Sequence, residues 1–208
     1  MLDKKKFYIN GEWVSPIEPR NFKVIDPSNE EVCAEISLGG KKDIDKAVSS
    51  AKKAFNSWAY SSKEERLDLL EKLYVVYKKR WAEMAKLITL EMGAPMKFST
   101  EMQAATGASH IKSFKNILKD FKFERDLGEE KNNQKLLYEP KGVCALITPW
   151  NWPINQVNLK VIPALASACT VVLKPSEIAP LSSMLLAEMI DEVKFPAGVF
   201  NLVNGDGE

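Results

Sequence analysis

Hydrophobic positions in the C-terminal third of the chain alternate between short apolar runs and longer amphipathic segments. The pattern predicts strands and helices in strict alternation: strands at Gly142–Ile147, Thr170–Lys174 and Val199–Val203, and helices at Ile154–Ala168 and Leu181–Val193. Strands that alternate with helices of this length pair in parallel through right-handed crossovers. Residues 141–208 therefore predict an α/β fold, the first mononucleotide-binding half of a doubly wound, Rossmann-like parallel sheet.

The preceding part of the chain opens with strand patterns and continues with helical ones. Apolar and aromatic residues between Phe7 and Val14 flank Asn10-Gly11, which predicts a hairpin with a type I′ turn. Further extended segments are expected at Lys23–Asp26 and Glu31–Ser37. Helical periodicity then covers Asp43–Trp58, one long segment from Ser62 to the stop at Gly93, and Phe98–Lys119. Residues 1–120 thus form an N-terminal hairpin and helical part.

A charged stretch separates these helices from the α/β part. Phe121–Arg125 and Lys135–Tyr138 are strand-like and flank a polar turn at Asp126–Asn133. We therefore expect a hairpin over residues 121–140 that projects from the domain.

The predicted half-sheet leaves one problem open. Its last strand, Val199–Val203, would present an unprotected edge. Either the chain is part of something longer, or another surface covers this edge.

Composition and charge exclude several kinds of function. The chain has 29 basic and 28 acidic residues and a net charge of +1, so its charge gives no reason to expect nucleic acid or an anionic membrane as partner. No signal peptide is expected, and the longest apolar stretch, Val161–Leu173, is too short to span a bilayer. Cys33, Cys144 and Cys169 form no CxxC motif, which favours the cytoplasm. The single histidine, His110, excludes a histidine-rich metal site and is interpreted as a helix-face residue.

The first candidate site follows the first strand of the α/β part, where open sheets bind their ligands. In Thr148-Pro149-Trp150-Asn151-Trp152-Pro153, two tryptophans and two prolines surround one asparagine. A rigidly held amide at a helix start can donate to a developing oxyanion. Alternatively, Asn151 caps the following helix, and spacing alone favours the cap.

The second candidate site, Lys174-Pro175-Ser176-Glu177, follows the second strand. An ammonium and a carboxylate on one tight turn can hold the vicinal diol of a ribose, and the carboxylate would repel a 2′-phosphate, which favours NAD over NADP. The alternative is a solvated ion pair that contributes little. The tail Gly205-Asp206-Gly207 carries only G-x-G and supports no strong interpretation.

The segments FYINGEWV, ITPWNWP, KVIPALASACTVVLKPSE and FPAGVFNLVNGDGE together resemble the N-terminal part of an aldehyde dehydrogenase. The resemblance runs from about Phe7 to the last residue. It implies an aldehyde dehydrogenase-like fold and NAD-dependent oxidation of an aldehyde to a carboxylic acid through a cysteine thiohemiacetal. It also implies that the projecting hairpin builds a homodimer or homotetramer of the full-length protein.

The resemblance further implies roles for individual residues. Asn151 resembles the asparagine whose amide shares an oxyanion hole with the backbone N–H of the nucleophile. Lys160 resembles a lysine with a supporting charge role, although a snorkelling side chain explains it equally well. The implied cofactor-binding residues are Thr148, Pro149, Trp150, Lys174, Ser176, Glu177 and Gly207. The implied substrate-tunnel residues are Trp152, Asn155, Gln156 and Leu159, of which the amides Asn155 and Gln156 favour a polar aldehyde.

The family's nucleophilic cysteine and general-base glutamate have no counterpart among these 208 residues. Cys33, Cys144 and Cys169 are interpreted as small core residues. Two classes of function therefore remain. The chain is either the front part of a complete dehydrogenase, inactive by itself, or a naturally short, non-catalytic nucleotide-binding or assembly module. The asparagine at position 151, which only catalysis needs, favours the first.

Overall fold

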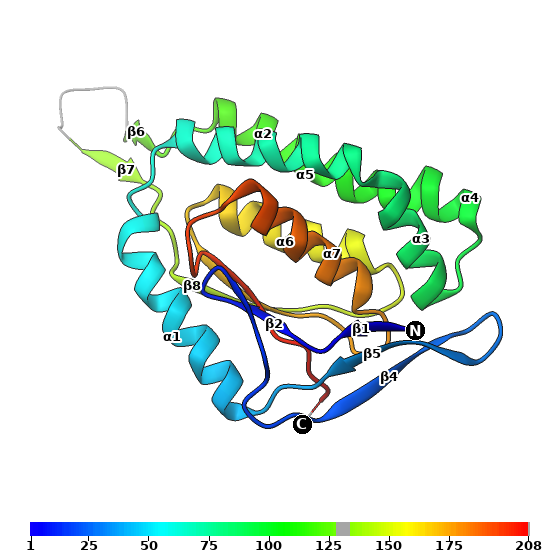
Figure 1. The fold of residues 1–208 in the computed structure, drawn as a ribbon. Coiled ribbons are helices and arrows are strands. Elements are labelled where there is room, and N and C mark those ends of the chain that lie inside the picture. Colours follow the sequence, from blue (N-terminus) through cyan, green and yellow to red (C-terminus); the bar gives the residue numbers. More distant parts are fainter. Residues whose placement is uncertain (128–133, 208) are drawn as a thin grey trace.

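A five-stranded sheet forms the centre of the computed structural model, which describes residues 1–127 and 134–207 (Figure 1). Its strand order is β3 (Glu12–Val14), β2 (Phe7–Ile9), β10 (Phe200–Leu202), β9 (Thr170–Lys174) and β8 (Val143–Ile147). Strands β8, β9 and β10 run parallel, whereas β2 runs antiparallel to both β10 and β3. The predicted parallel half-sheet is confirmed, and the N-terminal hairpin extends it.

Helices cover both faces of this sheet. The crossover helices α6 (Pro153–Ala166) and α7 (Leu181–Val193) pack on one face, and α1 (Lys41–Trp58) packs on the other. Figure 1 shows α2 (Lys63–Lys79) and α5 (Ala104–Asp120) as an outer layer above α6 and α7. This layering buries one face of each of these helices and confirms the predicted α/β class. None of the helices in the described ranges is long and apolar enough to cross a membrane.

The N-terminal hairpin covers the edge of β10. Tyr8 of β2 pairs with Leu202, and the turn residues Asn10 and Gly11 have φ angles of 57° and 78°, as a type I′ turn requires. The buried side chain of Asn201 ties the two segments together, because its Oδ1 accepts the N–H of Asn10 at 3.0 Å. The edge of the predicted half-sheet is thus covered by another surface of the same chain, the N-terminal hairpin.

A smaller sheet of three strands lies beside the first. It has the order β1 (Leu2–Lys4), β5 (Glu31–Ser37) and β4 (Asn21–Asp26). The sequence pattern predicted the last two strands but assigned no element to the basic N-terminus, which pairs in parallel with β5. Lys4 of β1 forms an ion pair with Glu188 of α7 at 2.5 Å.

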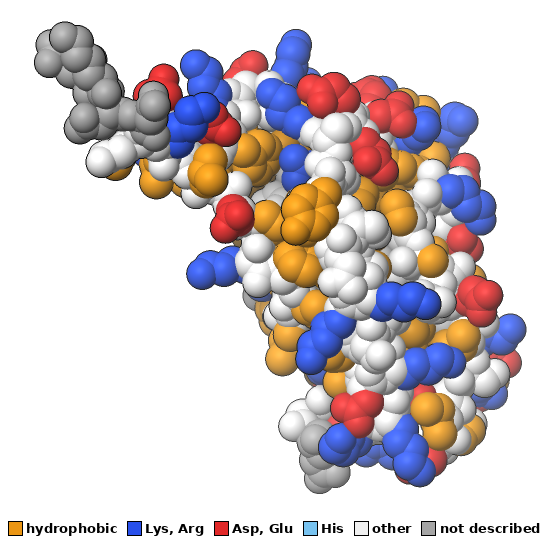
Figure 2. Space-filling model, turned by 90° about the vertical axis from the view of Figure 1, so that its left-hand side faces the viewer, with side chains coloured by type: hydrophobic (Ala, Val, Ile, Leu, Met, Phe, Trp, Pro, Cys, Tyr) orange, Lys and Arg blue, Asp and Glu red, His pale blue; other side chains and the backbone are white. Residues whose placement is uncertain are grey.

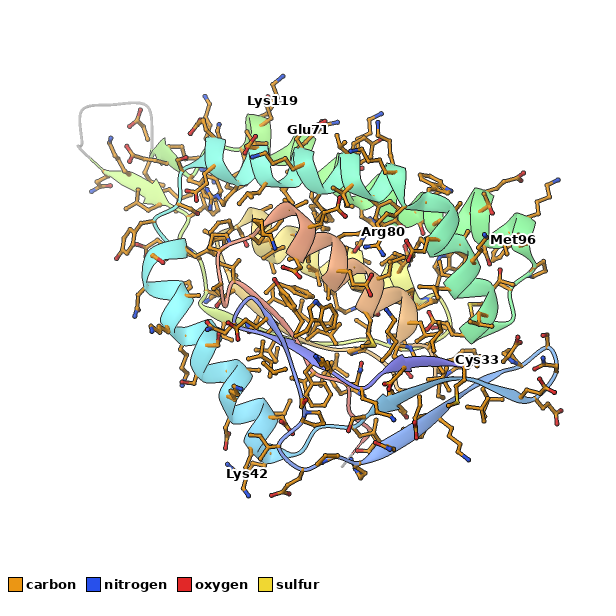
Figure 3. The ribbon with its side chains drawn as sticks, viewed as in Figure 1. Cys33, Lys42, Glu71, Arg80, Met96 and Lys119 are labelled. Atoms are coloured by element: carbon orange, nitrogen blue, oxygen red, sulfur yellow. The ribbon has the colours of Figure 1, made fainter. Side chains whose placement is uncertain are left out.

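The single long helix predicted from Ser62 to Gly93 is wrong. The structure has two helices, α2 and α3 (Trp81–Met92), which meet at Arg80 with φ −98° and ψ 16°. The guanidinium of Arg80 donates to Glu83 at 2.7 and 2.9 Å and to Glu188 of α7 at 2.6 Å. Figure 3 shows this side chain pointing from the helix junction towards α7. The apolar periodicity continues across the break, so the pattern alone does not reveal it.

The helix predicted at Phe98–Lys119 is present but begins irregularly. A short α4 (Met96–Phe98) leads into a π-helical turn, η1 (Ser99–Gln103), and then into α5. Wider π-helical turns are uncommon and have no signature in hydrophobic spacing.

The predicted hairpin after α5 forms from β6 (Glu124–Asp126) and β7 (Lys135–Leu137), which pair antiparallel and project from the domain (Figure 1). Most of the predicted turn at Asp126–Asn133 lies outside the described residues. Hydrophobic side chains gather beside the hairpin base (Figure 2). There they line an apolar groove of about 210 Å³ formed by Phe114, Ile117, Leu118, Phe121, Phe123, Pro163, Ala166 and Ser167.

The role of Asn201 can be tested by unfolding. Besides its bond to Asn10, its Nδ2 donates to the carbonyl oxygens of Val171 at 3.1 Å and Gly198 at 2.8 Å. We expect Asn201→Ala to lower the free energy of unfolding by about 2–4 kcal/mol, because backbone groups lose buried partners. Urea unfolding of the chain measures this loss. The control Asn29→Ala removes only an exposed turn contact, and an equal loss in both variants would contradict the assigned role.

Candidate functional site

The two sequence motifs meet at the carboxyl edge of the parallel sheet. Ile147, the last residue of β8, pairs with Lys174, the last residue of β9, and the N–H of Thr148 donates to the carbonyl oxygen of Lys174 at 3.3 Å. Beyond this point Thr148 is buried, whereas Trp150 and Asn151 are exposed. The structure thus brings the asparagine loop and the lysine loop to one rim of the sheet.

Asn151 does not cap helix α6. The N-cap residue is Trp152, with φ −152° and ψ 69°, and no side chain caps the helix. Pro153 occupies the first helical turn, where its missing N–H leaves no bond unmade. Within residues 1–127 and 134–207, no hydrogen bond joins the Asn151 amide to another residue. The capping interpretation favoured by spacing is therefore wrong, and the amide faces solvent.

Trp152 anchors the asparagine loop to neighbouring helices. Its indole N–H donates to Oγ1 of Thr106 at 3.2 Å, and its ring meets that of Phe98 edge-on with centroids 5.5 Å apart. The other tryptophan, Trp150, is 48% exposed and has no comparable contact in the part of the chain that the structure describes. Asn151 therefore sits directly beside one fixed aromatic residue.

One side of helix α6 remains open to this rim. The four residues expected to share a face are all half-buried or exposed: Trp152, Asn155, Gln156 and Leu159. The opposite side is buried in the core through Ile154, Val157, Asn158 and Val161. The predicted helical spacing of these positions is confirmed.

The only histidine contacts this open side. Nε2 of His110, on α5, lies 2.8 Å from Oδ1 of Asn155. His110 is a half-buried helix-face residue, as expected, but its partner lies 45 residues away in the sequence. No local pattern indicates such a contact.

Lys160 stays within its own helix. Its Nζ lies 3.3 Å from Oε1 and 3.4 Å from the carbonyl oxygen of Gln156. It is seven residues beyond Pro153, where α6 begins, roughly 10 Å along the helix axis. The structure therefore does not bring the Lys160 ammonium together with the exposed amide.

The Lys174 ammonium is held on two sides. Its Nζ donates to the carbonyl oxygen of Gly205 at 2.7 Å and lies 3.5 Å from Oε2 of Glu177. The two side chains are 22% and 26% exposed, so the pair is neither sealed in the core nor fully solvated. Ser176, between them, is buried, and its Oγ accepts the N–H of Ile178 at 3.3 Å. Gly205, whose carbonyl fixes the lysine, was noted in the sequence only as part of the G-x-G tail, and no local signal indicates its contact with Lys174.

The C-terminal tail lies near this lysine. Arg20 holds Asp206 by an ion pair of 2.9 Å. Gly207 is exposed, and a Cβ atom added there would meet no other atom within 4 Å. The tail thus contacts the Lys174 side chain through Gly205.

The three cysteines have the environment of structural thiols. Cys169 is buried, and Cys33 and Cys144 are half-buried against the core. Burial raises the pKa of Cys33, and burial together with the neighbouring Cys169 raises the pKa of Cys144 to about 11. Since the thiolate is the nucleophile, such thiols are poor candidates for covalent catalysis. In the described ranges, no cluster of His, Cys, Asp and Glu side chains could hold a metal ion.

Known proteins are similar to this chain in sequence and fold. Residues 13–208 match the profile of the aldehyde dehydrogenase family. A 3-succinoylsemialdehyde-pyridine dehydrogenase from a Pseudomonas species is 50% identical over 208 residues, which are 100% of this chain and 43% of the relative. The chain therefore spans less than half the length of that curated relative.

Solved structures agree with the sequence matches. An aldehyde dehydrogenase from Bartonella henselae superposes with a TM-score of 0.97 at 57% identity, over 100% of this chain and 44% of that one. A mutant aldehyde dehydrogenase C from Pseudomonas syringae, solved with NAD+ and octanal, gives a TM-score of 0.94 at 42% identity, over 98% and 41% of the two chains. The resemblance seen in the motifs is confirmed: this chain belongs to the aldehyde dehydrogenase family.

Proposed function

We propose that this chain is the N-terminal part of an NAD-dependent aldehyde dehydrogenase that oxidises an aldehyde to a carboxylic acid through a cysteine thiohemiacetal. The observation that carries the proposal is the unpartnered amide of Asn151 on the same sheet rim as the Lys174–Glu177 pair. Relatives from P. syringae and Staphylococcus aureus were solved with NAD+. The dinucleotide accepts a hydride from the substrate when it is bound.

The residues around Lys174 fit the sugar end of a dinucleotide. The ammonium and the carboxylate of Glu177 can share a vicinal diol, and the negative charge disfavours the 2′-phosphate of NADP. Gly207 is proposed to lie near the same end of the cofactor. The other residues that would lie along the cofactor are Thr148, Pro149, Trp150 and Ser176.

Asn151 is proposed to stabilise the negative charge that develops on the aldehyde oxygen. When a thiolate adds to the carbonyl carbon, the oxygen gains charge, and a preoriented amide N–H stabilises that charge more than it stabilises the neutral aldehyde. The raised pKa values of Cys33 and Cys144 argue against these two thiols as the nucleophile. The nucleophile and the general base are proposed to lie in the remaining part of a full-length enzyme.

The open side of α6 is proposed as one wall of the substrate site. Trp152 and Leu159 supply apolar surface, while Asn155 and Gln156 supply amides that suit a polar aldehyde. The 3-succinoylsemialdehyde-pyridine dehydrogenase is named for such a polar substrate. Lys160 is proposed to add positive charge at a distance.

The full-length protein is proposed to act in the cytoplasm on a small-molecule aldehyde, without nucleic acid or membrane as partner. The balanced charge of +1 supports this view. The projecting hairpin and the apolar groove at its base support a homodimer or homotetramer.

Removal of the Asn151 amide tests the oxyanion role. We expect Asn151→Ala in the full-length enzyme to lower kcat about 100- to 1000-fold, because one oxyanion donor is lost. The dissociation constant for NAD should change less than about twofold. Steady-state kinetics and titration of the cofactor measure the two effects. Asn29→Ala, at an exposed turn, serves as control, and an unchanged kcat in Asn151→Ala would refute the role.

Glu177 sets the expected preference between the two cofactors. We expect Glu177→Gln to raise the KM for NAD about tenfold and to change the KM for NADP much less, because the charged acceptor for the ribose hydroxyls is lost. The matched control is Glu192→Gln, which removes an exposed carboxylate from α7. If the ratio of the two KM values stays constant, Glu177 has no part in ribose binding.

The 208-residue chain should not oxidise aldehydes by itself, because its cysteines lack the environment of a nucleophile. Absorbance of NADH at 340 nm, followed for the chain and for the full-length protein with the same aldehydes, measures this difference. Steady NADH formation by the purified chain would overturn the prediction. A native mass of 23.4 kDa in the source cells would instead favour a short nucleotide-binding or assembly module.

A further inference from the structure

Helix α7 begins on a carboxylate supplied by another helix. Its N-cap is Pro180, and no side chain of its own caps the first turn. The N–H of Ser182 donates to Oε1 of Glu91 at 3.0 Å, and the N–H of Leu181 donates to Oε2 of the same carboxylate. Glu91 comes from the last turn of α3, about ninety residues earlier. Two otherwise unpaired N–H groups of the helix start are thereby satisfied.

This carboxylate is buried without a cationic partner. Glu91 is only 2% exposed, and no lysine, arginine or histidine of the described ranges forms an ion pair with it. Burial raises its pKa to about 7, against the lowering effect of the bonds from Ser182 and Leu181. The other titratable group that interacts with it is the thiol of Cys33 on β5. The two N–H groups and the positive end of the α7 dipole therefore stabilise the charge.

Such an arrangement is unusual for a helix start. Acidic side chains are almost never fully buried unless they are paired. At the start of helix α2, by contrast, an exposed local side chain caps the helix. Oγ of Ser62 accepts the N–H of Glu65 at 3.0 Å. The buried carboxylate of Glu91 instead ties the start of α7 to the last turn of α3.

The segment between β9 and α7 is fixed at both of its ends, and buried residues such as Ser176 and Ala179 pack between them. At the first end, Lys174 is fixed by its pairing with β8 and by the Gly205 carbonyl. At the second end, Glu91 fixes the first turn of α7. Glu177 lies between them, three residues after Lys174. The Glu177 side chain is partly exposed, and its carboxylate lies 3.5 Å from Nζ of Lys174. Its position therefore depends on the backbone of the segment between β9 and α7.

We propose that Glu91 is a positioning residue of the cofactor site, which holds the start of α7 and thereby holds Glu177 where a ribose diol can meet it. The inference rests on the proposed function of Glu177. Glu91 itself touches no cofactor, since its carboxylate is enclosed between α3 and α7. The contact between α3 and α7 thus preorganises the partly exposed loop that carries Glu177.

Glu91→Gln in the full-length enzyme tests this role. The amide keeps the size of the side chain but can accept from only one of the two N–H groups and turns its NH₂ towards the other. We expect the KM for NAD to rise about five- to twentyfold, while kcat at saturating NAD changes less than about threefold. Glu91→Asp keeps the charge on a shorter stem and should give a smaller rise; it replaces Glu91→Gln if that variant does not fold.

Glu188→Gln is the matched control for a purely structural effect. It also removes one carboxylate charge, but from the middle of α7, where Glu188 binds Lys4 at 2.5 Å and Arg80 at 2.6 Å. We expect this variant to lower Tm but to leave the KM for NAD unchanged.

A second readout is the pH dependence of NAD affinity. A protonated Glu91 loses one of its two acceptor oxygens, so NAD affinity of the unmodified enzyme should fall as the pH is lowered from 8 to 6. Glu91→Gln should lack this component.

An unchanged KM for NAD in Glu91→Gln, or an equal rise in Glu91→Gln and Glu188→Gln, would overturn the inference and leave the proposed function intact. If the unmodified full-length protein does not bind NAD, the proposed function and the inference fall together.

Discussion

The parallel pairing of β8 with β9 decides where the chemistry of this chain lies. Because Ile147 is in register with Lys174, the loops that follow both strands leave the sheet at the same height. A register shift of one residue would turn every side chain of a strand to the opposite face, so Lys174 would point away from its present partners. The fully buried side chains of Val171 and Leu173 make such a shift expensive.

The candidate site is exposed, and distant parts of the chain hold it in place. Thr106 on α5 fixes Trp152, the carbonyl of Gly205 fixes Lys174, and Glu91 on α3 fixes the start of α7. Each contact joins residues at least 31 positions apart in the sequence. A site that stabilises developing charge needs its groups in position before the substrate arrives, and these anchors supply that order.

The N-terminal hairpin covers the edge that the parallel half-sheet would otherwise leave open. A parallel half-sheet would expose the N–H and C=O groups of β10, which invites pairing with other chains. Strand β2 takes this edge, and Asn201 bonds both the hairpin turn and the neighbouring strand. The helices on the two faces of the sheet then enclose two hydrophobic clusters.

Local patterns in the sequence determined the type and order of most elements, since alternation, helical spacing and turn residues act between near neighbours. The strand Thr170–Lys174 and the helix Leu181–Val193 were predicted to the residue. The tertiary structure alone decided three matters: the helix break at Arg80, the release of Asn151 from a capping role, and the contact of His110 with Asn155. Each depends on side chains that meet only after folding, such as Glu188 beside Arg80 and Thr106 beside Trp152. Hydrophobic periodicity does not predict such tertiary contacts, because it indicates which face of an element is buried but not which residues pack against that face.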